Sequence, residues 1–319
     1  MMDSIENDFT LPITLFPTEI LRIILKNVDW RSIINLRLIS TFFNNFIMQN
    51  LNYLPKPKIR EFKIKSLYVN NDKIEVSLLF NCEYYLYDVM DVCISIDDKN
   101  IPQIEDYFKR MDFSRINFIE IDITGKSMIF DILSRYLTNH TVIGTIIIDI
   151  KRSPIFDSFS NFIKNLKNIS CLHLKKVCFS HQIIPHNYLL PMINTMEYLF
   201  IEECYCTTFI NPLMMNKLFL NNTSLKNIAI FSKCKTFQDD LFKNIKDRHK
   251  LSKYQKDKNI DYVIYLLSQN EDGNINEYLE NLFPSTNFYV NKWFTSINFH
   301  SCFSTKQCTV NEIQLNSLS

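Results

Sequence analysis

The sequence has 319 residues, of which 46% are hydrophobic and 22% are charged, and its formal net charge is +1. These proportions are typical of a packed protein and exclude a chain that is disordered throughout. The near-neutral charge argues against a general electrostatic attraction to nucleic acid or to an anionic membrane, so we expect neither as a partner.

Glycine is scarce, with only Gly125, Gly144 and Gly273 in the whole chain. Loops that cradle a phosphate need a backbone that approaches the ligand without a Cβ. Neither G-x-G-x-x-G nor G-x-x-x-x-G-K can be written in this sequence. The sequence therefore predicts no nucleotide-binding loop, and we expect no cofactor.

The N-terminal residues are acidic and lack the apolar region of a secretory signal peptide. No apolar run approaches the roughly 18 to 20 residues that a membrane-spanning helix needs. Nine cysteines are scattered between Cys82 and Cys308 without the spacing of a small disulfide-bonded domain. We therefore expect reduced thiols and a cytoplasmic or nuclear location, or both.

Residues 15–47 predict three short helices. Pro17 suits the first position of a helix, where its missing N–H is no disadvantage, and apolar residues recur at helical spacing from Ile20 to Val28. Asp29 and Ser40 are suitable N-caps for a second and a third helix. A unit this short buries little area alone, so we expect it to lean on a neighbour or a partner.

The segment resembles an F-box. The family pattern is a Leu-Pro pair, a Glu with aliphatic pairs, then Leu-Arg, an aliphatic-Ser pair and an aromatic residue. The corresponding residues here are Phe16-Pro17, Glu19, Ile20-Leu21, Ile24-Leu25, Leu36-Arg37, Ile39-Ser40 and Phe43. Phe16 and Phe43 replace the usual Leu and Trp, which keeps both positions apolar.

The resemblance implies docking on the small Skp-type adaptor of a cullin-RING ubiquitin ligase. It assigns the contact to apolar residues of the three helices, namely Leu15, Phe16, Pro17, Ile20, Leu21, Ile24, Leu25, Ile33, Leu36, Ile39 and Phe43. The alternative is that the helices only cap a repeat domain. A cap would bury the surface around Pro17, Ile20 and Leu36 inside the chain, whereas an F-box would leave part of it exposed.

The prolines at 55 and 57 end the helical segment. Two β-rich runs follow within residues 60–80, around a turn at residues 70–72. An apolar-x-x-apolar-x-apolar template then recurs six times, at Val89/Val92/Ile94, Ile116/Ile119/Ile121, Ile143/Ile146/Ile148, Ile169/Leu172/Leu174, Met196/Leu199/Ile201 and Leu225/Ile228/Ile230.

The middle positions of these six copies are 27, 27, 26, 27 and 29 residues apart. A regular step in the twenties with a strand at each start is typical of a leucine-rich-repeat solenoid. Helical spacing returns between the strands at residues 104–108, 129–137 and 275–282. Further strands are expected at residues 260–266 and 294–299, as irregular repeats.

We therefore expect an α/β protein with two parts. Residues 1–54 are the F-box helical motif, and residues 55–319 form a leucine-rich-repeat-like solenoid with parallel strands and backing helices, irregular after about residue 231. An ordinary α/β sheet is the alternative, since it also alternates strands and helices. The order of F-box and repeats resembles many F-box substrate receptors, and the composition is similar to that of the expanded F-box families of nematodes.

Metal-binding residue types occur together at Cys171, His173, Cys178 and His181. No second Cys or His pair follows at zinc-finger spacing, and Cys204-Tyr205-Cys206 lacks the C-x-x-C spacing of a redox pair. We interpret these residues as repeat packing and expect no metal site.

Nothing in the sequence indicates catalysis, because no G-x-S-x-G elbow or cysteine-nucleophile signature occurs. The basic stretch at residues 243–258 is either a patch for an acidic partner or, as we favour, a solvated helix end. We therefore expect a protein that is not an enzyme.

Residues between the buried strand positions are expected to point into the concave face of the solenoid. Mixed charges and exposed aromatics there suit protein recognition. The candidate substrate-binding residues are Glu120, Asp122, Asp149, Lys151, His173, Lys175, Phe200, Glu202, Asn298 and His300.

The sequence thus predicts a non-catalytic adaptor that recruits an unidentified protein substrate to a Skp-cullin-F-box ubiquitin ligase. The alternative is a leucine-rich-repeat scaffold with no link to a ligase.

Overall fold

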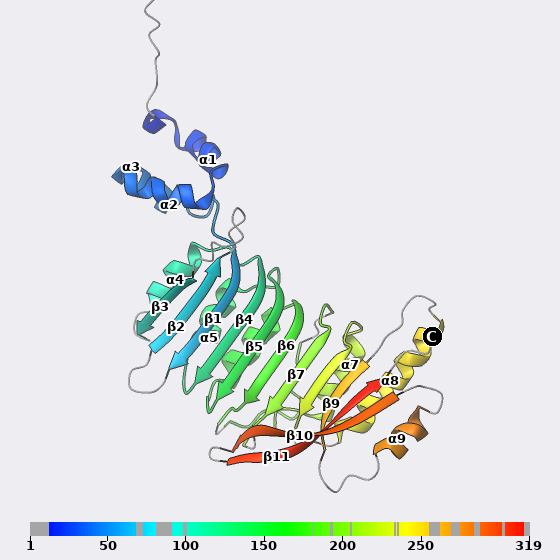
Figure 1. The fold of residues 1–319 in the computed structure, drawn as a ribbon. Helices are drawn as coiled ribbons and strands as arrows, with labels where there is room; N and C mark the ends of the chain where they lie inside the picture. The colour runs from blue at the N-terminus through cyan, green and yellow to red at the C-terminus, as the bar shows by residue number, and fades with distance from the viewer. Residues whose placement is uncertain are drawn as a thin grey trace, which may run out of the picture.

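The computed structural model describes residues 13–67, 73–80, 91–97, 101–180, 182–191, 194–204, 206–232, 234, 236–254, 262–268, 275–283, 288–301 and 304–315. Within these residues the fold is α/β. A group of short helices precedes one large sheet, and further helices alternate with its strands (Figure 1).

The three N-terminal helices lie where the sequence predicts them. After a short 3-10 turn, η1 (Ile13–Leu15), come α1 (Thr18–Lys26), α2 (Trp30–Ile39) and α3 (Thr41–Gln49). Pro17 is the residue just before α1 rather than its first residue, and its carbonyl oxygen accepts a hydrogen bond from the backbone N–H of Leu21 at 3.1 Å.

Both predicted N-caps are confirmed. The Asp29 carboxylate accepts hydrogen bonds from the backbone N–H groups of Arg31 at 2.9 Å and Ser32 at 3.1 Å. A hydrogen bond from the Ser32 hydroxyl makes the largest contribution to lowering the pKa of Asp29, and the two backbone bonds lower it further. The Ser40 hydroxyl accepts from the N–H of Phe43 at 3.3 Å. Each cap satisfies a donor that would otherwise lack a partner at the start of its helix.

The sheet has eleven strands in the order β10-β11-β9-β8-β7-β6-β5-β4-β1-β2-β3. Its strands are β1 (Ile59–Leu67), β2 (Lys73–Phe80), β3 (Asp91–Asp97), β4 (Arg115–Thr124), β5 (Val142–Lys151), β6 (Asn168–Val177), β7 (Tyr198–Glu203), β8 (Asn227–Phe231), β9 (Tyr262–Ser268), β10 (Phe288–Ser301) and β11 (Ser304–Leu315). The seven strands β1 and β4–β9 are parallel, and antiparallel strands lie at both edges.

The predicted repeat step sets the register of the parallel strands. The middle apolar residues of successive strands are direct partners, in the order Phe62, Ile119, Ile146, Leu172, Leu199, Ile228 and Ile264. All seven side chains are buried. Five of them, from Ile119 to Ile228, are middle positions of the predicted template at steps of 26 to 29 residues, whereas Phe62 and Ile264 lie 57 and 36 residues from their partners. The template therefore marks the residues that strands β4–β8 turn toward the core.

Helices connect most of the parallel strands, although none is assigned between β6 and β7 in the described residues, and they cover the face of the sheet that lies behind the strands in Figure 1. They are α4 (Ile101–Lys109), α5 (Ile129–Tyr136), α6 (Phe156–Asn165), α7 (Pro212–Asn221), α8 (Phe237–Tyr254) and α9 (Ile275–Leu282). Phenylalanines fill the layer between them: Phe130 stacks on Phe162 with ring centroids 5.1 Å apart, and Phe159 contacts Phe179 at 5.2 Å.

The helices and the sheet have separate cores. Leu21, Leu25, Ile33, Phe43, Phe46, Ile47 and Leu54 form the first, whereas the second begins at Ile59 and shares no residue with it. The linker between them contains Pro55 and Pro57, which stiffen it. The linker backbone is also bonded to the sheet domain directly before β1, since the N–H of Asp112 donates to the carbonyl of Pro57 at 2.9 Å.

Two of the expected repeats are wrong. Val92 and Ile94 lie in β3, which pairs antiparallel with β2 at the edge of the sheet, while β1 takes the expected place beside β4 (Val89 lies outside the described residues). Residues 294–299 lie in β10, an edge strand antiparallel to β11, instead of a further parallel repeat. An apolar template records which residues face a core, but it carries no strand direction.

We predict that Gly144→Ala destabilises the fold by about 1–3 kcal/mol, because a Cβ added at Gly144 would lie 2.6 Å from the backbone oxygen of Asn117 on the neighbouring strand. Urea unfolding would measure the change. Val142→Thr, at an exposed position of the same strand, should stay within about 0.5 kcal/mol of wild type. A Gly144→Ala variant as stable as this control would contradict the close approach of the two strands.

Candidate binding surfaces

The three N-terminal helices expose a concentration of large apolar side chains. Those exposed are Ile13, Leu15, Phe16, Ile20, Ile23, Ile24, Ile34, Leu38, Ile39, Phe42, Met48 and Tyr53, which we call the N-terminal apolar surface. Leu38 is 83% exposed and Ile39 is 70% exposed. Elsewhere among the described residues such side chains are scattered over many elements, so this group is a candidate interaction surface.

The residues that the F-box resemblance assigns to docking divide into two sets. Leu15, Phe16, Pro17, Ile20, Ile24 and Ile39 are exposed, and Leu36 is half-buried. Leu21, Leu25, Ile33 and Phe43 are instead buried in the first core. These four hold the helices together and are not available to a partner in this arrangement.

Sequence reasoning missed Ile23, Ile34 and Leu38, which are exposed on the same helices. The sequence of α2 does indicate an exposed apolar side, because apolar residues occupy both sides of this helix. Ile33 faces the core, while its neighbour Ile34 and Leu38, one turn later, face outward. Among the described residues, one apolar side of α2 is therefore packed in the first core and the other is exposed.

Polar contacts fix the helices relative to one another. Arg22 donates from Nε to Oδ1 of Asn50 at 2.6 Å, and its guanidinium lies 4.8 Å from the ring centre of Tyr53. Arg37 donates from Nε to Oδ1 of Asn44 at 3.1 Å. These bonds join α1 and α2 to α3 and its C-terminal end, so the N-terminal apolar surface has a defined shape.

A second candidate surface is the sheet face opposite the helices, which we call the open face. Of the predicted substrate-binding residues, Glu120, Asp122, Asp149, Lys151, His173, Lys175, Phe200 and Glu202 lie on neighbouring strands β4–β7. Asn298 and His300 lie on β10, at the far edge, and their side chains are outside the described part of the structure.

Acidic and basic residues of the open face pair both across strands and along β5. Lys151 Nζ lies 2.9 Å from Asp122 Oδ2 and 3.3 Å from Asp149 Oδ2, and Lys63 Nζ lies 3.5 Å from Glu120 Oε2. The charges therefore compensate one another. This arrangement suits a partner with polar groups of both signs better than a polyanion.

Aromatic rings follow the charged residues along the open face. The ring of His173 lies 3.9 Å from that of Phe200, which in turn lies 5.1 Å from Phe231. Burial, followed by the charge of Lys175, lowers the pKa of His173 to about 4. The imidazole is therefore neutral near pH 7, and its Nε2 is buried without a hydrogen-bond partner among the described residues.

Two carboxyl groups of the open face are nearly buried. Asp149 and Glu202 are each 8% exposed. Burial raises the pKa of Asp149 and raises that of Glu202 to about 7, although Lys176 acts against the shift at Glu202. A carboxyl group held partly protonated near neutral pH can donate as well as accept a hydrogen bond.

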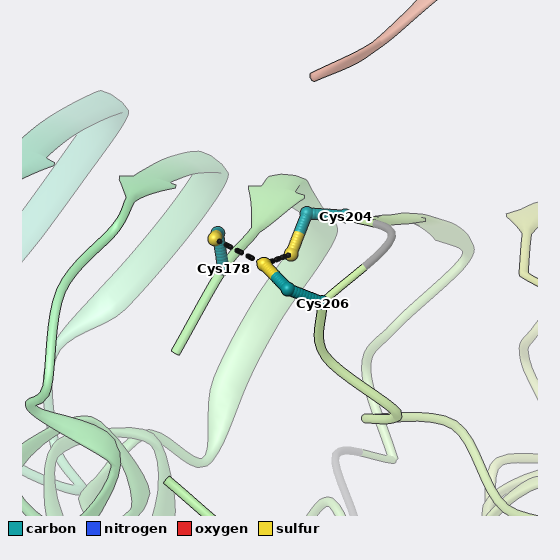
Figure 2. A group of neighbouring side chains, drawn as sticks. All are labelled: Cys178, Cys204 and Cys206. Atoms are coloured by element: carbon teal, nitrogen blue, oxygen red, sulfur yellow. Dashed lines mark hydrogen bonds between the residues drawn. The ribbon is translucent and has the colours of Figure 1, made fainter. Parts of the chain in front are cut away.

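The Cys171, His173, Cys178 and His181 group does not come together among the described residues. Cys171 and His173 lie on β6, Cys178 follows that strand, and His181 is outside the described residues. Cys178 instead meets Cys204 and Cys206, with all three sulfurs within 4.8 Å of one another (Figure 2). The hydrogen bond from Cys178 lowers the pKa of Cys204 to about 5, and the same pairing, with burial, raises the pKa of Cys178.

A cavity of about 720 Å³ lies where the linker meets the start of the sheet domain. Residues of the linker, of α4, of the loop before β4 and of α5 line it, among them Lys56, Phe113 and Tyr136. The chain folds against itself here, and the cavity holds no group that points to a particular ligand.

The basic stretch at residues 243–258 begins inside α8. Leu241, Phe242 and Ile245 are buried there, while Lys243 and Asp247 are exposed. This is the pattern of an amphipathic helix with a solvated face. Within the described residues, none of the helices combines the length and apolar character needed to span a membrane.

We predict that Glu202→Gln is more stable than wild type at pH 8, by about 2 kcal/mol, because the buried carboxylate must otherwise stay charged. The folded-state pKa of about 7 exceeds the ordinary 4.5, so folding binds a proton, and wild-type stability falls as the pH rises between these values. The advantage of the variant should vanish near pH 4. Denaturant unfolding at several pH values would measure it.

The matched control is Glu120→Gln, on the same face but with a side chain that is 45% exposed. It should leave the pH dependence close to that of wild type. Equal pH profiles for Glu202→Gln and wild type would mean that the Glu202 carboxyl group is not desolvated.

Comparison with known proteins adds no relative to this chain. A scan against protein-family models gives no match, and a search of curated proteins gives none either. The F-box pattern in the sequence, the N-terminal apolar surface and the open face are therefore the features that bear on function.

Proposed function

We propose that this protein is a substrate-recognition adaptor of a Skp-cullin-F-box ubiquitin ligase. The N-terminal helices dock on a Skp-type adaptor, and the repeat domain binds a target protein. The observation that carries the proposal is the N-terminal apolar surface, exposed on a helical unit whose sequence has the F-box pattern. A helical cap would have buried this surface against the sheet.

Some of the F-box residues can build the small core while others on the same helices contact a partner. Leu21, Leu25 and Ile33 build the small core, so that the exposed residues on the same helices are held in a fixed arrangement. An apolar surface that is already ordered loses less conformational entropy when a partner covers it. The proposed contact is therefore made by exposed residues such as Ile20, Leu38 and Ile39, supported from behind by the buried set.

We further propose that the sheet domain is a leucine-rich-repeat-like solenoid. From β4 to β9 the strands follow one another in chain order, and the parallel sheet contains no reversal of strand order after β4. Helices lie on one face only in Figure 1. A doubly wound α/β sheet would instead reverse its strand order and carry helices on both faces. Stacked repeats agree better with this arrangement.

In this proposal the open face receives the target. It combines paired charges with the His173–Phe200–Phe231 row, and mixed polar and aromatic surfaces suit protein partners. The stiff linker of residues 55–58 then keeps the target near the ligase. The protein would act by raising the effective concentration of one partner near the other, without making or breaking a bond itself.

We predict that the full chain binds a purified Skp-type adaptor and that a Leu38→Asp, Ile39→Asp variant binds at least tenfold more weakly. Two charges would lie where apolar contacts are required. Both residues are mainly exposed, so the variant should keep the circular dichroism and unfolding temperature of the wild type. Isothermal titration calorimetry would measure the affinities.

The matched control is Ile183→Asp, an equally apolar-to-charged change at a position of the sheet domain that is 91% exposed. It should bind like wild type. Leu21→Asp is unsuitable as a test, because Leu21 is 1% exposed and its loss would disrupt the first core. A folded wild-type chain that fails to bind the adaptor would reject the ligase proposal and leave a repeat scaffold.

A further inference from the structure

The register of the sheet brings three cysteines from two successive repeats to one point. Cys178 comes directly after β6 and Cys204 directly after β7. The backbone N–H of Cys204 donates to the carbonyl of Val177 at 3.2 Å, and that of Cys178 donates to Ile150 at 3.1 Å. Both cysteines therefore continue the hydrogen-bond ladder at the carboxyl edge of the sheet, side by side.

The third thiol, Cys206, reaches back from the loop after β7 and lies between the other two (Figure 2). Its Sγ is 3.1 Å from Sγ of Cys178 and 2.9 Å from Sγ of Cys204. Glu203 holds this loop in place, since its carboxylate accepts hydrogen bonds from the backbone N–H groups of Phe209, at 2.7 Å, and Ile210. The approach of the three sulfurs is thus fixed by the fold.

The geometry fits a small thiophilic cation. Zinc binds cysteine sulfur at about 2.3 Å with tetrahedral angles, which sets the sulfurs about 3.8 Å apart. The three sulfurs here already lie within 4.8 Å of one another, so shifts of about 1 Å or less would complete the set. A disulfide would use only two of the three sulfurs, whereas a metal ion uses all of them.

Exposure differs among the three thiols in a way that suits binding from solution. Cys178 and Cys204 are each 4% exposed, and Cys206 is exposed. The Thr207 hydroxyl lies 3.3 Å from Cys204 Sγ and accepts from the N–H of Phe179 at 2.9 Å, which ties the loops of both repeats together behind the sulfurs. The buried pair is thus held rigidly, and the exposed thiol provides an entry path.

We propose that Cys178, Cys204 and Cys206 bind one zinc ion as three thiolates, with the fourth position open to solvent beside Cys206. The spacing of cysteines in the sequence instead leads us to expect no metal site. When zinc binds, each thiol that is still protonated would lose its proton to the solvent. The ion would join two consecutive repeats at the edge of the sheet, a role that is independent of ligase docking.

The test uses the full chain, purified under reducing conditions, stripped of metal and titrated with Co²⁺ as a spectroscopic probe and then with Zn²⁺. Wild type should bind one Co²⁺ per chain, with the strong sulfur-to-cobalt charge-transfer absorption of thiolate ligands, and Zn²⁺ should displace it. Cys206→Ser should bind at least tenfold more weakly. Zn²⁺ should raise the unfolding temperature of wild type more than that of this variant.

The matched control is Cys171→Ser, which removes a half-buried cysteine of β6 from outside the cluster and should behave like wild type. Cys206 is exposed, so its replacement should leave the fold intact, as circular dichroism would verify. Absence of thiolate–cobalt absorption in the wild type, or equal spectra for wild type and Cys206→Ser, would overturn the proposal. A disulfide between two of these cysteines that persists under the reducing conditions of the purification would also overturn it and indicate a redox pair.

Discussion

The parallel register of strands β4–β8 is the constraint on which the other features depend. Because each apolar triplet recurs after 26 to 29 residues, a side chain lies beside its counterpart one repeat later in the sequence. This register brings Lys151 to Asp122, His173 to Phe200, and Cys204 to Cys178. Each contact joins residues far apart in the chain, so a one-residue slip of a single strand would turn its apolar set away from the core and separate these pairs together.

The two cores leave surfaces of different character. The first core is small and leaves large apolar side chains exposed around it, which is typical of a surface that another protein covers. The second core is long and phenylalanine-rich, and charged side chains of its outer strand face form ion pairs. The linker of residues 55–58 between the two cores contains two prolines, which restrict its backbone.

Much of the architecture was predictable from local chemistry. The caps Asp29 and Ser40 and the repeat step are readable because one helix start or one strand face depends on a few nearby residues. The antiparallel pairing of β3 and β10 was not predictable, because an apolar template records which residues face a core and not how the strand pairs with its neighbours. The Cys178 group was missed because Cys178 lies 26 residues before Cys204 and 28 before Cys206, a spacing that resembles no motif until the strand register is applied. Which apolar residues of α2 face outward also depends on tertiary packing.

The order of the last strands has a consequence for how the sheet is completed during synthesis. β11 follows β10 in the chain but pairs with β9, and β10 pairs only with β11 among the described strands. The free edge of β9 therefore stays open until residues 304–315 have left the ribosome and turned back. Unpaired strand edges with apolar neighbours are sites of misassociation. Until β11 pairs with it, the edge of β9 is thus the part of the described sheet that is open to pairing with another chain.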